Sequence, residues 1–140
     1  MPAPALNYPE AHLDDLDAIR SDLIETLERI DVRSSVLLEV VSAVIEAVCN
    51  VLTHGYGRDP GWLSIEVQRR SQALYIRLAD RAPIFDPTRL ASPRVDIPLH
   101  QRPAGGFGVH MLRTFMDRVE HCPRPGGGNE LSMIKEDAFP

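Results

Sequence analysis

The sequence predicts an α+β fold in which a mostly antiparallel sheet packs against helices as a two-layer α/β sandwich. Two long segments near the start, residues 12–30 and 34–54, repeat apolar residues at three- and four-residue steps, which is the period of a half-buried helix. Two later segments, 62–68 and 73–79, alternate apolar and polar residues, which is the period of a strand with one buried face. The full order of helix, helix, strand pair, loop, helix and strand pair is typical of two packed layers.

The first helix is expected from His12 to Ile30, after a brief extended piece at Ala5 to Tyr8. Its apolar stripe consists of Leu13, Leu16, Ile19, Leu23, Ile24, Leu27 and Ile30. Three aspartates near its start suit the positive end of the helix dipole. A short connection, Asp31 to Arg33, then leads to the second helix.

The second helix, Ser34 to His54, organises the chain. A serine at either of its first two positions can cap it, and a glycine follows its last residue as a usual stop signal. Glu46, Asn50 and His54 follow one another at four-residue steps, so they climb one helical face beside the apolar stripe. Taken alone, this face is read more simply as the solvated side of an amphipathic helix than as the wall of a site.

The first strand pair, Trp62 to Gln68 and Ala73 to Ala79, is expected to form a hairpin whose apolar face meets the helices. A proline-dotted stretch from Asp80 to Pro103 follows without a sustained period, and so long an irregular segment usually marks a binding loop or lid. A third helix is expected over Val109 to Val119. The closing hairpin is expected to end with the strand Glu130 to Lys135.

The composition fits one domain over residues 1–140, with 44% apolar and 25% charged residues. A formal net charge of -5 argues against a general binder of nucleic acid or of anionic membranes. No apolar run is expected to reach the length of a membrane span, and the first residues have no export-signal pattern. With only Cys49 and Cys122, and no CxxC or HExxH spacing, we expect a cytoplasmic protein without a zinc site.

Three features of the sequence point to chemistry. The first is the ladder of three polar residues on the second helix. The second is Asp80, which stands where a strand ends and an irregular segment begins. The third is the cluster Gly105, Gly106 and Gly108 before a helix, where glycines allow close backbone approach and free amides favour a phosphate. Each signal is weak alone, because such residues are common in turns, but together they indicate one site.

These motifs resemble those of the bacterial anti-sigma-factor serine kinases that act in partner switching. The matching stretches are Glu46-xxx-Asn50-xxx-His54, then Asp80-Arg81-Ala82-Pro83-Ile84-Phe85-Asp86-Pro87, then Gly105-Gly106-Phe107-Gly108-Val109. That family belongs to the wider class of ATPases shared by gyrase, histidine kinases and mismatch-repair proteins, which have the Bergerat ATP-binding fold. The resemblance covers nearly the whole chain, from Leu6 to Lys135.

The resemblance implies an ATP-dependent protein-serine kinase that acts as an anti-sigma factor. Such a protein phosphorylates a small antagonist and, in its other state, binds a sigma factor or a comparable regulatory target. Relatives of this kind tend to be dimeric, so a homodimer is expected. An isolated catalytic part of a histidine kinase is disfavoured, because 140 residues leave no room for a dimerising helix pair.

By the same resemblance, three residues receive roles in phosphoryl transfer. Asn50 would coordinate the Mg2+ that bridges the nucleotide phosphates, and Glu46 would act as general base toward a serine hydroxyl. Asp80 would accept a hydrogen bond from the adenine amino group and so distinguish ATP from GTP.

The phosphates would be wrapped by Gly105, Gly106 and Gly108, with Pro83 to Ala104 as a lid. Arg102 is either a phosphate-neutralising residue or an ordinary solvated arginine. His54 matches a histidine common in the family, but it could equally cap the helix end and receives no catalytic role.

The sequence also departs from the family pattern. Ala82 and Ile84 occupy places where the family usually has glycine, so Ile84 is expected to be strained or to narrow the pocket. Asn129 stands where a threonine is common. A second interpretation therefore stays open: a non-enzymatic partner-binding switch module with a degenerate nucleotide pocket.

Overall fold

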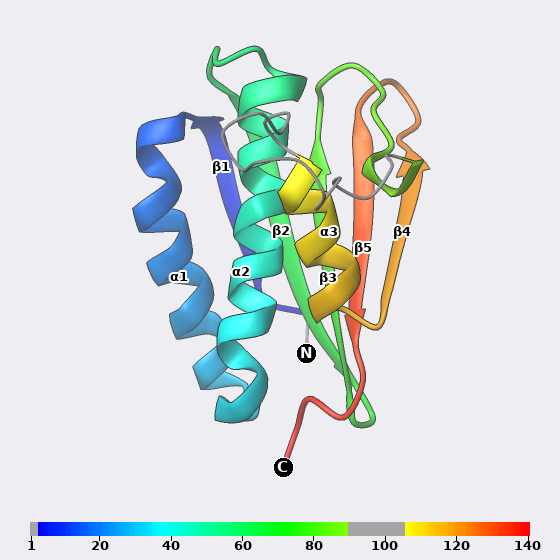
Figure 1. Cartoon of the computed structure of the whole chain (residues 1–140). Coiled ribbons are helices and arrows are strands. Elements are labelled where there is room, and N and C mark those ends of the chain that lie inside the picture. Colours follow the sequence, from blue (N-terminus) through cyan, green and yellow to red (C-terminus); the bar gives the residue numbers. More distant parts are fainter. Residues whose placement is uncertain (1–2, 90–105) are drawn as a thin grey trace, which may run out of the picture.

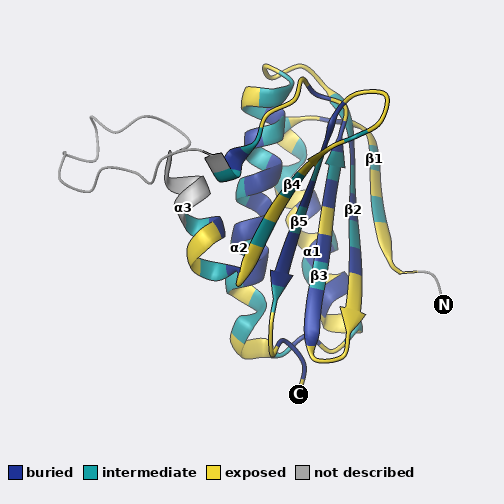
Figure 2. Cartoon of the chain, turned by 90° about the vertical axis from the view of Figure 1, so that its right-hand side faces the viewer, coloured by how far each residue is buried: buried dark blue, intermediate teal, exposed yellow. Residues whose placement is uncertain are grey.

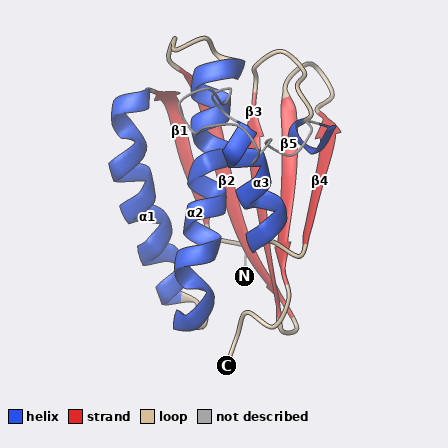
Figure 3. Cartoon of the chain, in the orientation of Figure 1, coloured by secondary structure: helices blue, strands red, loops and turns tan. Residues whose placement is uncertain are grey.

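The computed structural model describes residues 3–89 and 106–140, with the backbone alone at 89 and 106–110, and shows three α-helices on one face of a five-stranded antiparallel sheet (Figures 1 and 3). The strands lie in the order β1-β2-β3-β5-β4. The helices are α1 (Leu16–Arg29), α2 (Ser34–Asn50) and α3 (Gly106–Phe115), and the strands are β1 (Ala5–Ala11), β2 (Gly61–Arg70), β3 (Ala73–Asp80), β4 (Arg118–Pro123) and β5 (Asn129–Lys135). The predicted two-layer fold is confirmed.

The register of the three central strands explains which sheet face meets the helices. Ile65 of β2 pairs with Leu78 of β3, which pairs with Leu131 of β5, and all three are buried. Side chains one position along point to the opposite face, where Arg77 forms ion pairs with Glu66 and Glu130. Figure 2 shows the result, with β3 and β5 mostly buried and the edge strands β1 and β4 more exposed.

Strand β1 is longer than the predicted extended piece, because it runs to Ala11 despite Pro9. A proline is tolerated there because β1 is an edge strand and its pairing with β2 shifts register between Tyr8 and Ala11. The Tyr8 hydroxyl donates a hydrogen bond of 2.6 Å to Oδ2 of Asp22, which ties this edge to α1.

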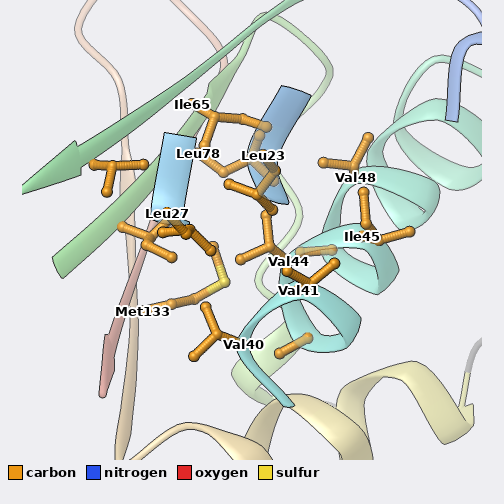
Figure 4. Packing of buried hydrophobic residues seen from close by; sticks show 14 of the residues in the cluster. Leu23, Leu27, Val40, Val41, Val44, Ile45, Val48, Ile65, Leu78 and Met133 are labelled. Carbon is orange, nitrogen blue, oxygen red and sulfur yellow. The ribbon is translucent and has the colours of Figure 1, made fainter. Parts of the chain in front are cut away.

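Helix α2 is the central helix of its layer, with α1 on one side and α3 on the other (Figure 1). Its apolar stripe packs into the core against α1 and the sheet, as Figure 4 shows for Val41, Val44, Leu23 and Ile65. Each such side chain contributes about 1.5–3 kcal/mol when fully buried. The apolar faces predicted for the first two helices therefore pack into one shared core.

The predicted first and second helices both change geometry at one end. The first begins with the 3-10 turn Leu13–Asp15 before α1, and the second ends with the π-helical turn Val51–Gly55 after α2. In the π turn the N–H of Tyr56 donates to the carbonyl of Val51 over 2.8 Å, five residues back. Residues beyond Asn50 therefore leave the straight α-helical face that the four-residue spacing predicted.

Helix α3 begins and ends earlier than the predicted Val109 to Val119. Its C-terminal end is capped by Lys135, whose Nζ donates to the carbonyl of Phe115 over 2.6 Å. The N–H of Asp117 then donates to the carbonyl of Ile134 over 2.9 Å, so sheet pairing has begun and Val119 belongs to β4. At its start, α3 includes Gly106 and Gly108, which were expected to precede it.

The C-terminal residues form part of the core. Ala138 and Phe139 are fully buried, and the N–H of Ala138 donates to the carbonyl of Gln72 over 2.8 Å. The Arg33 N–H donates to the carbonyl of Ala138 over 2.7 Å, and its guanidinium reaches the carbonyl of Phe139. The tail thus ties the β2–β3 turn to the connection between α1 and α2.

The segment Ser34–Gly55 is long and apolar enough to cross a membrane, with 22 residues and a mean hydropathy of 2.0 in its most apolar window. The expectation that no run reaches that length is therefore wrong. Half of that window is buried inside the fold, where α2 contacts the sheet and both other helices. Its hydropathy is accounted for by its central place in the core.

Candidate functional site

A pocket lies between the C-terminal end of α2 and the adjoining ends of β3, β4 and β5. Its empty space is about 420 Å³, open solvent at the mouth included. Its lining consists of Ala47, Asn50, Val51, Gly55, Leu78, Asp80, Ala82, Phe85, Pro87, His121, Asn129 and Leu131. The walls are thus mainly apolar, with four polar side chains that come from four different elements. This is the usual make-up of a site for a small organic ligand.

Asp80 ends β3 with its side chain on the helix-facing side, and it is only 2% exposed. Its Oδ1 accepts hydrogen bonds from the N–H of Ala82 over 2.8 Å and from Nδ2 of Asn129 over 2.9 Å. Burial raises the pKa of this carboxyl above its ordinary value, and the hydrogen bonds from Asn129 and Ala82 and the charge of Arg124 act against that rise. A buried carboxylate of this kind is typical of a functional site.

Asn129 begins β5 directly opposite Asp80 in the sheet, and its buried side chain connects four chain segments. Besides its bond to Asp80, its Nδ2 lies 3.1 Å from the carbonyl oxygen of Pro83. Its Oδ1 accepts from the N–H of Phe85 over 2.8 Å and lies 2.8 Å from Nε2 of His121. The residue that departs from the family pattern is therefore the hub of this pocket.

The segment after β3 does not show the strain that its missing glycines predicted. Neither Ala82 nor Ile84 has a positive φ angle, so neither needs glycine's freedom. Ile84 is 63% exposed and does not line the pocket, so the expectation that it narrows the pocket is wrong. Ala82 is buried against Gly55, where an added Cβ would lie 2.9 Å from the Ala82 Cβ.

The three polar residues of the helical ladder separate. Asn50 is buried, lines the pocket, and has no side-chain hydrogen bond to any described residue. Glu46, one turn earlier, is half-buried and does not line the pocket, and His54 lies in the π turn with an exposed side chain. The single continuous face expected for all three is wrong, since the helix widens after Asn50.

The glycine cluster lies only partly within the described residues. Gly106 is the first residue of α3 and Gly108 lies in its first turn. The first four N–H groups of an α-helix have no partner within the helix, so this end offers donors to an anion. Gly105 and Arg102 lie outside the described residues.

One pocket residue, His121, and one residue behind the pocket wall, Tyr56, carry no signal in the sequence. His121 reaches the pocket because its register on β4 pairs it with Leu131, on the helix-facing side. Tyr56 stands behind the wall: its hydroxyl donates to the carbonyl of Trp62 over 2.6 Å and accepts from the N–H of Arg81 over 2.7 Å. It thereby fixes the point at which the chain leaves β3. Only the pairing of strands and turns brings these residues to the site.

The donor set fits a nucleotide-bound magnesium ion better than a metal held by protein alone. Among the described residues, no group of three or more His, Cys, Asp or Glu side chains converges on a metal site. Mg2+ usually takes few protein oxygens and several from water and phosphate. The buried amide of Asn50, without a partner among the described residues, fits the single protein oxygen that such an ion needs.

The sequence is similar to one protein family and to several proteins of known activity. The chain matches the histidine kinase-like ATPase domain family over residues 10–135. It is 30% identical over 100 residues to an anti-sigma F factor of Thermoanaerobacter sp. (strain X514), covering 71% of this chain and 69% of that protein. It is 26% identical over 94 residues to the serine/threonine-protein kinase BtrW of Bordetella bronchiseptica, covering 66% of each chain. These matches span about two thirds of the relatives' length.

A further relative, the serine-protein kinase RsbW of Bacillus cereus (strain AH187), is 29% identical over 82 residues, covering 56% of this chain and 51% of that one. Among solved structures, that of the RsbU and RsbW domains of Rv1364c from Mycobacterium tuberculosis superposes with a TM-score of 0.66 at 18% identity. It covers 99% of this chain and 34% of that one, and it supports the fold. The chain therefore belongs to the histidine kinase-like ATPase family, among its anti-sigma-factor serine/threonine-protein kinases, as its motifs predicted.

Proposed function

We propose that this protein is an ATP-dependent protein-serine kinase that acts as an anti-sigma factor and phosphorylates a small antagonist protein. The observation that carries the proposal is the joint placement of Asp80 and Asn50 in one apolar pocket. One is a buried hydrogen-bond acceptor on the sheet, and the other is a buried amide on α2 without a partner among the described residues. Adenine recognition needs a hydrogen-bond acceptor and Mg2+-bound phosphate needs an oxygen ligand for the metal, so one cavity that holds both groups suits ATP.

Asp80 recognises the base. The adenine ring packs against the apolar pocket walls, and its amino group donates a hydrogen bond to the carboxylate. Because Oδ1 of Asp80 already accepts two hydrogen bonds, Oδ2 is the oxygen that remains for this contact. Guanine presents a carbonyl acceptor at the same position, so an ionised carboxylate repels it.

The phosphates extend from the base toward α3. Asn50 holds Mg2+ through its side-chain oxygen, and the free N–H groups at the start of α3, with Gly106 and Gly108, receive phosphate oxygens. Gly105 and Arg102, which lie outside the described residues, would add contacts to the phosphates. Bound Mg2+ supplies charge neutralisation for the phosphoryl group that is transferred.

Glu46 acts as the general base. Four residues of α-helix advance about 6 Å, so Glu46 lies one turn before Asn50 and outside the pocket lining. The protein substrate would bring its serine to that side of the pocket. The serine oxygen of the antagonist forms a bond to the γ-phosphorus while the bond from that phosphorus to the β-bridging oxygen breaks. ADP leaves, and the serine proton passes to the Glu46 carboxylate.

The partners follow from this role. The kinase acts on a serine-bearing antagonist and binds a sigma factor or a comparable regulatory target in its other state. It works as a homodimer in the cytoplasm, without nucleic acid or membrane as partner, and the net charge of -5 supports the last two exclusions.

The test is phosphoryl transfer from Mg-ATP to candidate antagonists, read as phosphoserine by mass spectrometry. Glu46→Gln should lower the transfer rate by about 10²–10⁴-fold and leave ATP affinity unchanged. Glu39→Gln is the matched control, because Glu39 lies on the same helix but contacts Lys135 at 3.4 Å, away from the pocket. Full transfer by Glu46→Gln, or no transfer by the wild type to any candidate, overturns the proposed activity.

A partner-binding module without turnover is the second candidate function. The observation that favours it is that Glu46 does not line the pocket, so no proton acceptor reaches into it from this position of α2. ATP binding without transfer, together with antagonist and sigma-factor binding that Glu46→Gln leaves unchanged, would select this alternative.

A further inference from the structure

His121 contacts Asn129 on the side away from Asp80. Its Nε2 lies 2.8 Å from Oδ1 of Asn129, and its side chain is only 5% exposed. The opposite nitrogen, Nδ1, lies 3.9 Å from Oδ2 of Asp86, at the start of the irregular segment. Asp86 in turn accepts hydrogen bonds from the N–H and the hydroxyl of Thr88. A polar chain therefore runs from the segment after β3, through β4 and β5, to Asp80.

The orientation of the Asn129 amide is fixed by its partners. A backbone N–H can only donate, so the atom that receives the N–H of Phe85 over 2.8 Å must be the oxygen. Nδ2 then faces Asp80, which can only accept while it is ionised. A flipped amide would set its oxygen against the Asp80 carboxylate and its NH₂ against a donor.

The same argument fixes the tautomer of His121. Because Asn129 presents its oxygen, Nε2 of His121 must carry a hydrogen and donate it. Nδ1 is then free to accept in the neutral ring or to pair with Asp86 in the charged ring. His121 therefore donates to Asn129 in either state, and the Asn129 oxygen receives two donors from two different segments.

We propose that His121 is a positioning residue of the nucleotide site, which sets base specificity by holding the Asn129 amide toward Asp80. This inference rests on the proposed function, because it concerns how the same pocket selects adenine. Asn129 also contacts the carbonyl of Pro83 and the N–H of Phe85, so the same amide holds the segment that lacks the usual glycines. Asn129, held by His121, thus fixes the backbone of Ala82–Phe85 by side-chain hydrogen bonds, whereas the family pattern uses glycines in this segment.

The consequence for specificity follows from the protonation of Asp80. A carboxylate accepts from the adenine amino group, whereas a protonated carboxyl group can donate to the carbonyl of guanine. The Asn129 side chain is the largest influence that lowers the pKa of Asp80 against the effect of burial. Loss of the His121 donor leaves the N–H of Phe85 as the remaining donor to the Asn129 oxygen, so the amide is held less firmly toward Asp80. Asp80 then takes up a proton at higher pH, and discrimination falls.

The experiment measures the Kd of Mg-ATP and Mg-GTP from pH 5 to 8 for the wild type, His121→Leu and His121→Gln. In His121→Leu the ratio of the GTP Kd to the ATP Kd should fall about 10-fold, and the pH at which ATP affinity is half lost should rise. His121→Gln keeps an N–H donor at the position of Nε2 and should restore both quantities. His12→Leu is the matched control, because it makes the same change at an exposed histidine outside the pocket.

A second measurement does not need a nucleotide. The side-chain carbon resonance of Asp80 reports its pKa by NMR in the free protein, and His121→Leu should raise that pKa while His121→Gln should not. Arg124, whose guanidinium donates to the Asp80 carbonyl at 3.2 Å, and the neighbouring Tyr56 are the same in every variant. Circular dichroism confirms that each variant is folded before its titration is compared.

The outcomes separate the two proposals. If the wild type binds neither nucleotide but His121→Leu raises the pKa of Asp80, the proposed function and the role in base specificity fail, while His121 still positions Asn129 toward Asp80. If the wild type binds ATP and His121→Leu changes neither the Kd ratio nor the pH profile, the positioning role is overturned. It is also overturned if His121→Gln behaves like His121→Leu, since only the bulk of the ring would then matter.

Discussion

The side-chain amide of Asn129 donates a 2.9 Å hydrogen bond to the carboxylate of Asp80, across two neighbouring strands that place the residues directly opposite each other. Asp80 is buried at the end of β3, and Asn129 is buried at the start of β5. The pair therefore joins Asp80, the acidic group among the described pocket residues, to the glycine-rich turn that precedes β5. Substitutions in this turn and at this carboxylate test the arrangement directly.

Gly128 packs directly against the backbone of Asp80. It has a φ of +106°, and a Cβ at this position would lie 2.0 Å from the carbonyl oxygen of Asp80. Gly128→Ala should lower the free energy of unfolding by at least about 2 kcal/mol, because it adds a steric clash to backbone strain, and it should abolish ATP binding. Gly127→Ala is the control: its φ is +109° but nothing lies within 4 Å, so it should cost about 1 kcal/mol and preserve binding. Equal effects in urea unfolding would refute the close contact.

Ionised Asp80 should lower the free energy of unfolding at neutral pH, although the same carboxylate is needed for nucleotide binding. Burial raises its pKa in the folded state, so the folded protein binds this proton more tightly than the unfolded chain and loses stability as pH rises through that pKa. Asp80→Asn keeps an oxygen to accept from Ala82 and Asn129, so it should be more stable than the wild type at pH 7 and lack adenine binding. The stability gap should close as pH falls toward about 4, the ordinary aspartate range. Urea unfolding from pH 4 to 8 measures it, and a gap that widens on acidification would show that the sign is wrong.

The two residues that replace the family's glycines should differ sharply in their effects. Ile84→Ser should change ATP affinity less than about 2-fold, because the side chain is exposed and outside the pocket. Ala82→Val should lower affinity about 10-fold or more, because added methyl groups would overpack the wall beside Gly55. Isothermal titration of both variants with Mg-ATP decides the point. A large loss in Ile84→Ser would mean that this side chain faces the nucleotide.

The C-terminal tail should matter for stability and not for nucleotide affinity. Phe139 is fully buried and its ring is covered by the guanidinium of Arg69 at 4.3 Å. Phe139→Ala should lower the free energy of unfolding by about 3–5 kcal/mol. Asp137→Asn, which removes only an exposed ion pair with Arg33, should cost about 0–1 kcal/mol. A change below 1 kcal/mol in Phe139→Ala, measured in urea, would mean that the tail does not pack in solution as described.

The repeat of apolar residues along short stretches was enough to predict which face of the sheet is buried and that helices cover it. The alternation around Ile65 and Leu78 predicts two half-buried strands, and the stripe through Val41 and Val44 predicts a buried helix, since each pattern depends on neighbours in sequence. The helix ends were less predictable. The sequence does not reveal that Lys135 would cap α3 at Phe115, because that contact joins residues 20 positions apart.

The site was predictable only where a motif marked it. Asp80 and Asn50 stand in recognisable motifs, and the structure brings both to one pocket. His121 and Asn129 meet because β4 and β5 pair in one particular register, which no local pattern fixes. The burial of Phe139 likewise depends on two distant segments, the β2–β3 turn and the connection between α1 and α2, and its own stretch has no period.

The most direct test of the account is calorimetric titration of the wild type, Asp80→Asn and Asn50→Ala with Mg-ATP. The wild type should release or take up heat on saturable binding, Asp80→Asn should show no binding, and Asn50→Ala should lose the dependence of affinity on Mg2+. Unchanged binding in Asp80→Asn, or no binding of Mg-ATP by the wild type, would contradict a nucleotide held between α2 and the end of β3.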